Sequence, residues 1–166
     1  NDDAKRVLKL GAWPRKENKL WDEVVGMLQD VKYFEFTGGE PFLIQEHFDL
    51  LEKSAELGHA KHQQVHYNTN GTTFPKKAVE HIWPHFGEVE IAFSIDDIGK
   101  RFEYQRYGAK WDQVAQNIQK FNDLKQTHKN IKTQICCTIN IQNIYNLDAV
   151  ADWICLQILK IEYSIS

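Results

Sequence analysis

Helix-like and strand-like apolar patterns alternate along this chain of 166 residues, and the alternation restricts the fold more than any other feature. Residues 31–37 alternate with the period of a strand, whereas Val114, Ile118 and Phe121 recur at helical spacing within residues 111–125. Strands that alternate with helices are joined by crossovers, so the sequence predicts an α/β fold with a parallel sheet. Similar patterns predict helices at 18–30, 45–57, 75–86 and 146–157, and strands at 65–68, 89–95, 131–141 and 158–166.

The composition predicts one globular domain. Apolar residues make up 42% of the chain and charged residues 26%, a balance that can bury a substantial core. We find no linker, so residues 1–166 are expected to form a single domain, with residues 1–17 as an irregular lead-in. Its sheet of about five strands would be doubly wound or would curl toward a barrel. The chain starts at Asn1 and stops inside a predicted strand, so we expect it to be a fragment of a longer protein.

Charge and cysteine content restrict the partners and the compartment. The net charge is −3 with both signs interspersed, which argues against nucleic acid or an acidic membrane surface as a partner. No apolar run is long enough to span a membrane, and the N-terminal sequence has no secretory signal. The three cysteines, Cys136, Cys137 and Cys155, do not form a disulfide framework. These features predict a cytoplasmic protein.

Small and hydrogen-bonding residues follow each of four predicted strands. In parallel α/β folds ligands bind at the carboxyl ends of the strands, so these residues predict a site for a polar small molecule. Taken singly, each cluster can also be explained as a turn or a helix cap. In chain order the clusters are Thr37 to Glu40, Asn68 to Gly71, Ser94 with Asp96 and Asp97, and Thr138 with Asn140, Gln142 and Asn143.

The sequence Gly38-Gly39-Glu40-Pro41 favours one kind of ligand group. Two glycines let the backbone approach a ligand closely and expose carbonyl oxygens, and the carboxylate of Glu40 can accept hydrogen bonds from an ammonium group. The segment has no lysine of the P-loop type, and no G-x-G-x-x-G occurs in the chain. The segment therefore suits the α-amino end of an amino acid better than a phosphate.

Three motifs in this order, FTGGEPFL, NTNG and FSIDD, resemble the radical S-adenosylmethionine superfamily. The segment DIGKRFEYQRYGAKWDQV, followed by ICCTINIQN, is similar to members with a twitch or SPASM-type C-terminal extension. The resemblance covers residues 31–166 and implies a partial, TIM-like (β/α) barrel. It also implies a [4Fe–4S] cluster, held by a C-x3-C-x2-C loop, that cleaves S-adenosylmethionine reductively. The resulting 5′-deoxyadenosyl radical would abstract hydrogen from a substrate.

The resemblance gives roles to the residues after the first two strands. Thr37 begins the glycine segment, and Gly38, Gly39 and Glu40 would hold the methionine amino group. Asn70 would lie near the same cofactor. For Gly38, Gly39 and Glu40 the resemblance agrees with the chemistry expected from the residue types alone.

Residues after the later strands would complete the cofactor site. By resemblance, Ser94 and Asp96 would reach the ribose or carboxylate, and Thr138 and Asn140 would line the adenosine side. Arg106 would pair with the methionine carboxylate, or it would simply form a surface salt bridge. The sequence does not identify catalytic residues.

The cysteines depart from the family pattern. The chain has no C-x3-C-x2-C, and its three cysteines are better explained as core or structural thiols than as cluster ligands. We therefore expect the first strand and the cysteine loop to lie upstream of Asn1 and the fragment to be inactive. Without that strand, the edge beside residues 31–37 would be open to self-association or would be covered by residues 1–17.

Two further groups of residues were weighed as a metal site and as substrate contacts. His81 and His85 have a spacing that can bind zinc, but Pro84 lies between them and no third ligand is evident. Tyr104, Tyr107 and Trp111 lie in or near the long irregular stretch predicted at residues 96–110. They would close over a substrate, although core packing is the ordinary role of a tryptophan.

Three functions remain open from the sequence. The first is a radical S-adenosylmethionine enzyme acting on a peptide, amino-acid or cofactor-precursor substrate. The second is a non-catalytic module that binds S-adenosylmethionine without a cluster. The third is an unrelated α/β enzyme with Glu40 or Asp96 as a general base.

Overall fold

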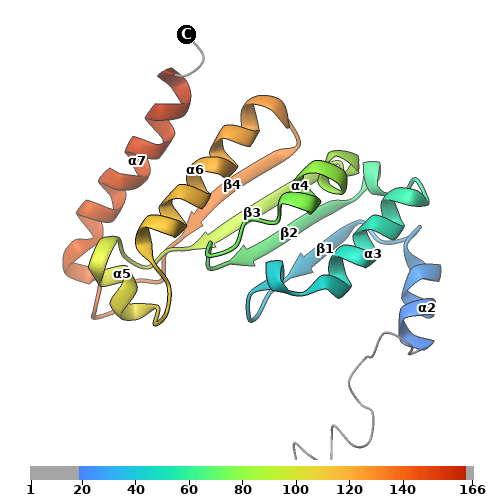
Figure 1. Cartoon of the computed structure of the whole chain (residues 1–166), viewed down its shortest axis with the longest axis horizontal. Helices are drawn as coiled ribbons and strands as arrows, with labels where there is room; N and C mark the ends of the chain where they lie inside the picture. Colours follow the sequence, from blue (N-terminus) through green and yellow to red (C-terminus); the bar gives the residue numbers. More distant parts are fainter. Residues whose placement is uncertain (1–18, 164–166) are drawn as a thin grey trace, which may run out of the picture.

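The computed structural model describes residues 19–163, and the side chains within residues 23–156. Four strands form one sheet, and helices connect them (Figure 1). The strands are β1 (Tyr33–Phe36), β2 (Gln64–Thr69), β3 (Glu88–Ser94) and β4 (Ile131–Cys136). The α-helices are α2 (Lys19–Met27), α3 (Gln45–Glu56), α4 (Lys76–His81), α5 (Gly99–Gln105), α6 (Trp111–Thr127) and α7 (Leu147–Tyr163). Short 3-10 turns are η1 (Pro41–Leu43), η2 (Ala60–His62), η3 (Trp83–His85) and η4 (Ile144–Asn146).

The sheet is parallel throughout, and its strands follow the order of the chain, β1-β2-β3-β4. Val65 of β2 pairs with Phe34 of β1 and with Val89 of β3, and Val89 pairs in turn with Ile131 of β4. Each connection between neighbouring strands carries a helix, as parallel pairing requires. The predicted α/β class and parallel sheet are confirmed.

The core lies between the sheet and α3, α4 and α6, which cover one of its faces (Figure 1). Phe121 of α6 is fully buried and packs near Phe42, Trp83 and Phe93. Tyr67 of β2 is also fully buried, and its hydroxyl accepts a hydrogen bond from Trp83 Nε1 at 3.4 Å. Burial in this aromatic cluster raises the pKa of Tyr67, because the phenolate would be poorly solvated there.

The end of the chain differs from the sequence prediction. Residues 158–166 were expected to form a strand, but α7 continues as one helix to Tyr163, and residues 164–166 lie outside the described part of the chain. The described residues therefore form four strands rather than about five. The predicted strand at 131–141 ends earlier, at Cys136. The predicted lead-in, residues 1–17, also lies outside the described residues.

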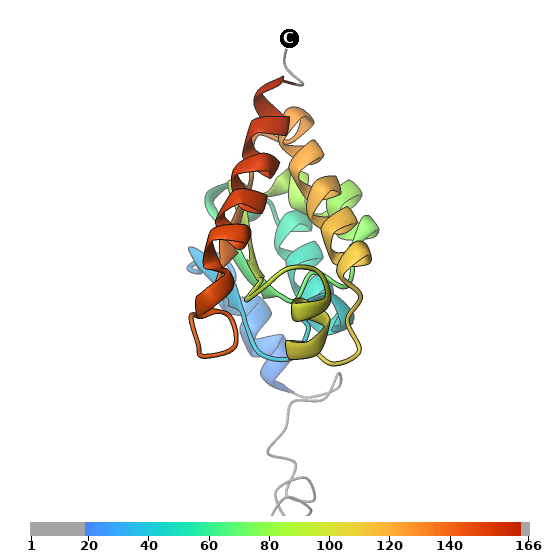
Figure 2. The same cartoon turned by 90° about the vertical axis from the view of Figure 1, so that its left-hand side faces the viewer.

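The stretch at residues 96–110 is not irregular, because it contains α5. Phe102 of α5 is buried and its ring lies 5.2 Å from that of Trp111, which lies 5.0 Å from Trp153 of α7. Figure 2 shows α6 and α7 side by side at this contact. Trp111 is therefore a packing residue and not one that closes over a substrate.

None of the helices in the described part of the chain is long and apolar enough to cross a membrane.

Strand β1 lies at one edge of the sheet. Among the residues that the structure describes, β2 is its one strand partner. Self-association through this edge stays a prediction.

Candidate functional site

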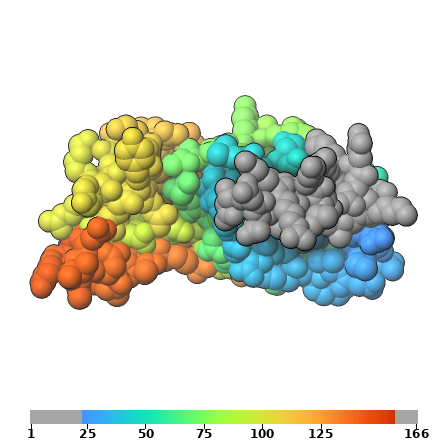
Figure 3. Space-filling model, turned by 90° about the horizontal axis from the view of Figure 1, so that it is seen from below, coloured from blue at the N-terminus to red at the C-terminus, as the bar shows by residue number. Residues whose placement is uncertain are grey.

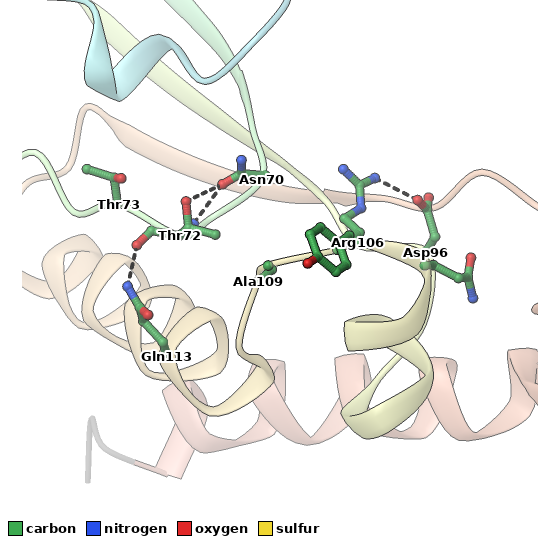
Figure 4. Close-up of a pocket in the computed structure, with 10 residues that line it drawn as sticks. Asn70, Thr72, Thr73, Asp96, Arg106, Ala109 and Gln113 are labelled. Carbon is green, nitrogen blue, oxygen red and sulfur yellow. Dashed lines mark hydrogen bonds and ion pairs between the residues drawn. The ribbon is translucent and has the colours of Figure 1, made fainter.

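A cavity of about 640 Å³ lies at the carboxyl edge of the sheet (Figure 4). Residues 70–73 after β2, Asp96 after β3, residues 105–109 and Gln113 of α6 contribute its walls. Figure 3, seen from below, shows the segment near residue 70 (green) between those near residues 40 (cyan) and 105 (yellow), with the segment near residue 140 (orange) beside the yellow one. The ends of these strands therefore lie at one edge of the sheet, as the sequence predicted.

The turn after β2 is fixed by α6. Gly71 has a φ of 74°, and a Cβ there would lie 3.0 Å from Cγ1 of Val114, so only glycine fits without strain. Asn117 Nδ2 donates to the Gly71 carbonyl oxygen at 3.0 Å, and Gln113 Nε2 donates to the Thr72 carbonyl oxygen at 2.8 Å. These contacts hold the turn against the first part of α6 and give the cavity a rigid wall.

Asn70 forms a local turn with its own side chain. Its Oδ1 accepts hydrogen bonds from the Thr72 backbone N at 2.9 Å and from Thr72 Oγ1 at 2.6 Å (Figure 4). This Asx-type turn explains the residue types at both positions. Among the described residues no hydrogen bond uses the Nδ2 group of Asn70, so this donor is available to a ligand.

Glu40 joins the ends of β1 and β2. Its Oε1 accepts from Thr69 Oγ1 at 2.7 Å and from the Phe42 backbone N at 3.3 Å, and its Oε2 accepts from the Asn70 backbone N at 2.9 Å. Gly38 and Gly39, with φ of 82° and 33°, turn the chain toward this carboxylate. Three protein donors already use the Glu40 carboxylate, so it fixes the position of the glycine segment.

Asp96 makes the equivalent connection between β3 and β4. Its Oδ1 accepts from the Thr138 backbone N at 3.0 Å, and its Oδ2 pairs with Arg106 Nη2 at 2.6 Å. Its backbone oxygen accepts from Nδ2 of the buried Asn143 at 2.7 Å. The carboxylate thus fixes the arginine at the cavity wall and the loop after β4.

The salt bridge predicted for Arg106 is present, but it is half-buried rather than on the open surface. The guanidinium Nε is buried and has no hydrogen-bond partner in the described part of the chain. Among the described residues, only Nη2 of the three guanidinium nitrogens has a hydrogen-bond partner. The arginine therefore lines the cavity with N–H groups that the protein does not use.

Asp97 is structural. It is fully buried, and its Oδ1 accepts from the Ile98 backbone N at 2.8 Å and from Asn146 Nδ2 at 2.5 Å. Gln105 Nε2 donates to its Oδ2 at 3.3 Å. Asp97 thereby connects both ends of α5 to η4, and it positions the helix that leads into the lining residues 105–109.

The cysteines are not the core thiols that the sequence predicted. Cys136 and Cys155 are exposed, and Cys137 is half-buried, with its thiol 3.7 Å from the Asp96 backbone oxygen. Burial raises the pKa of the Cys137 thiol, and the neighbouring Asp96 adds to the effect. Residues 19–163 contain no group of three histidine, cysteine, aspartate or glutamate side chains that could hold a metal ion. A [4Fe–4S] cluster therefore does not fit the described residues.

The structure brings part of the predicted set together. Asn70, Asp96 and Arg106 line the cavity. Glu40 accepts a hydrogen bond from the Asn70 backbone N, and the Thr138 backbone N donates one to Asp96. The other predicted residues lie along the same edge without lining the cavity. They are Thr37, Gly38 and Gly39 in the exposed segment after β1, Ser94 at the end of β3, and Asn140 in the turn after Thr138.

Several lining residues were missed. Thr72 and Thr73 directly follow the predicted Asn-Gly turn, so their position next to the site could have been inferred. Gln105 and Gln113 carried no signal, because their orientation depends on how α5 and α6 pack. Tyr107, by contrast, was considered from the sequence: it lines the cavity and is fully exposed, and its closing over a substrate stays a prediction.

Neither a comparison with models of known protein families nor a search of curated proteins found a match to this chain.

Proposed function

We propose that the cavity binds S-adenosylmethionine and that the parallel sheet is part of the partial barrel of a radical S-adenosylmethionine enzyme. The observation that carries the proposal is Arg106, which lines a polar cavity and whose guanidinium group is fixed there by Asp96 through Nη2 alone. A ligand carboxylate is the group that would satisfy such a donor best. The cavity volume is in the range of small-molecule sites.

Each part of the ligand has a candidate partner. Arg106 would bind the methionine carboxylate, and the Asn70 Nδ2 group would donate to a ligand oxygen. The segment Gly38 to Glu40 would receive the amino group, mainly through its backbone oxygens because the Glu40 carboxylate already holds three donors. Ser94, Thr138 and the turn with Asn140 would lie on the ribose and adenine side, as in the resemblance.

The proposal for these residues is binding, and it includes no redox step. The iron–sulfur cluster does not fit the described side chains, so its cysteines would have to come from outside the chain. Hydrogen abstraction from a peptide or small-molecule substrate would then belong to the full-length enzyme, in the cytoplasm. The second candidate, a binding module without a cluster, makes the same prediction for ligand binding.

The general-base alternative has less support. Glu40 and Asp96 each accept two or more hydrogen bonds from protein donors, and no bond to a histidine activates either carboxylate within the described residues. Carboxylates held in this way orient other groups more readily than they accept a proton.

Titration calorimetry of the chain with S-adenosylmethionine tests the binding. We expect Arg106→Gln to weaken binding about tenfold or more, because it removes a charge-assisted hydrogen bond. Arg101→Gln is the matched control, since this exposed arginine lies on α5, just before Arg106, and does not line the cavity. Equal loss in both variants, or no binding by the unmodified chain, would overturn the proposal.

Coding DNA upstream of Asn1 separates the two forms of the proposal. An in-frame C-x3-C-x2-C within a few tens of codons supports the radical enzyme. A start codon directly before Asn1 would leave only the binding module.

A further inference from the structure

The face of the sheet opposite α3, α4 and α6 is polar, which is unusual for parallel strands. Parallel sheets are normally apolar on both faces because helices cover both. Here β2 and β3 alternate, so that Val65 and Tyr67 are buried in the core while His66 between them is directed to the other face. We call this surface the open face. Its polar and aromatic side chains are Tyr33, Glu35, Gln64, His66, Asn68, Glu88, Glu90, Lys132 and Gln134. The register also places Ala92, which is fully buried, between Asn68 and Gln134 on this face.

His66 lies at the centre of the open face and is held by its neighbours. Its Nδ1 is 2.7 Å from Glu90 Oε2, and Asn68 Nδ2 lies 3.3 Å from its Nε2. The ring also stacks on Tyr33, with ring centroids 6.4 Å apart. Its side chain is only 12% exposed, whereas that of Glu90 is 35% exposed. The imidazole therefore has a fixed orientation. A ligand would reach it next to Glu90, whose side chain is the more exposed of the two.

The two contacts of the ring fit one neutral tautomer of His66. With Asn68 Nδ2, a donor, at 3.3 Å from Nε2, we assign Nε2 as the acceptor and place the proton on Nδ1, next to Glu90 Oε2. The Asn68 contact is long, so a stronger donor can replace it at Nε2. An imidazole fixed in this form accepts a hydrogen bond at Nε2.

The charges around His66 favour a cationic donor. Glu35 of β1 and Glu90 of β3 are the register partners of His66 on its two sides. Lys132 of β4 is the register partner of Glu90, and its ammonium group is paired with Glu88 at 2.5 Å. The register therefore places three carboxylates, those of Glu35, Glu88 and Glu90, on the same face as one lysine. The surroundings of Nε2 therefore offer acceptors and negative charge.

We propose that His66 and Glu90 form a binding site for a primary ammonium group, with Nε2 of His66 accepting one of its N–H hydrogen bonds and the Glu90 carboxylate balancing its charge. The site is separate from the cavity at the carboxyl edge, since neither residue lines that cavity. It does not depend on the proposed binding of S-adenosylmethionine.

Two small cations test the proposal in the chain as it exists. Ethylammonium and tetramethylammonium carry the same charge, but only ethylammonium can donate a hydrogen bond. In the chain with ¹⁵N-labelled histidine we expect ethylammonium to shift the Nε2 resonance of His66 with saturation, and tetramethylammonium to leave it nearly unchanged. Equal responses to both cations, or a shift that does not saturate, would overturn the proposal. This comparison needs no variant, so it decides the question even if a variant fails to fold.

A matched pair of variants adds a second test. Glu90→Gln should weaken ethylammonium binding about tenfold or more, because it removes the charge beside the imidazole. The control is Glu80→Gln, which removes a carboxylate 3.9 Å from the exposed His81. If Glu80→Gln lowers the affinity as much as Glu90→Gln, or if Glu90→Gln lowers it little, the site is not at His66. Arg106→Gln should leave the response intact, so failure here and failure of the cavity proposal are distinguishable.

Discussion

Under α3, α4 and α6 the strands present aromatic side chains that exclude water, whereas on the open face the same strands present an imidazole, carboxylates and amides. The contrast lies between adjacent residues: Tyr67 is fully buried in the aromatic cluster, and His66 beside it pairs with Glu90. One face of this sheet therefore carries the buried apolar core, and the other face presents polar side chains. The carboxyl edge, where the cavity lies, borders both.

The largest expected effect is on the covered face. Phe121→Ala should lower the free energy of unfolding by about 3–5 kcal/mol, because it removes a fully buried ring and leaves a cavity in the aromatic cluster. Urea unfolding measures it, with Phe121→Leu as a control that should lose clearly less. A small loss for Phe121→Ala would mean that the covered face is not the main source of stability.

A pH effect of similar size is expected from His47 of α3, also on the covered face. It is buried against Phe36 and Phe48, its Nε2 has no partner among the described residues, and burial lowers its pKa to about 4. The unfolded chain binds a proton here near pH 6.5, but the folded chain binds it only near pH 4. Stability should therefore fall by up to about 3 kcal/mol as the pH drops from 6.5 to 4.

The variant His47→Leu isolates this effect, because it keeps an apolar side chain of similar size and removes the titration. The difference in unfolding free energy between unmodified chain and variant should change between pH 6.5 and 4 and stay constant above pH 7. A difference that is independent of pH would show that His47 is protonated as easily in the folded chain as in the unfolded one.

The smallest effect should come from the open face. Lys132→Gln removes the ion pair with Glu88, but the lysine is well exposed and water solvates both charges. We expect almost no change in the urea midpoint. A loss comparable with that of Phe121→Ala would mean that the open face also carries stability, and the division between the faces would not hold.

Most of the fold could be predicted because its periodicities are strong. The apolar positions of α6 and the alternation in β3 each fit one element type only. Residues 158–163 were predicted as a strand because so short a segment fits a strand as well as a helix. In the structure these residues continue α7, which ends at Tyr163. The helix α5 was missed because it is short and has only one buried residue, Phe102.

The location of the candidate site could be predicted from the sequence, but the contacts between its residues could not. Parallel strands end at one edge, so polar residues such as Asn70 and Asp96 had to meet there. That Asp96 would hold both Arg106 and the Thr138 backbone could not be predicted, because it depends on the paths of two loops. The same holds for Glu40, whose carboxylate turned out to be used by protein donors.

The order of the strands in the sheet, which is the order of the chain, has a consequence for synthesis. When β2 leaves the ribosome, its partner β1 is already present, and the same is true for β3 and β4 in turn. No strand has to wait for a later one to fill a gap between two earlier ones. The sheet can thus be assembled one strand at a time during translation, and each step covers the edge that the previous step left exposed.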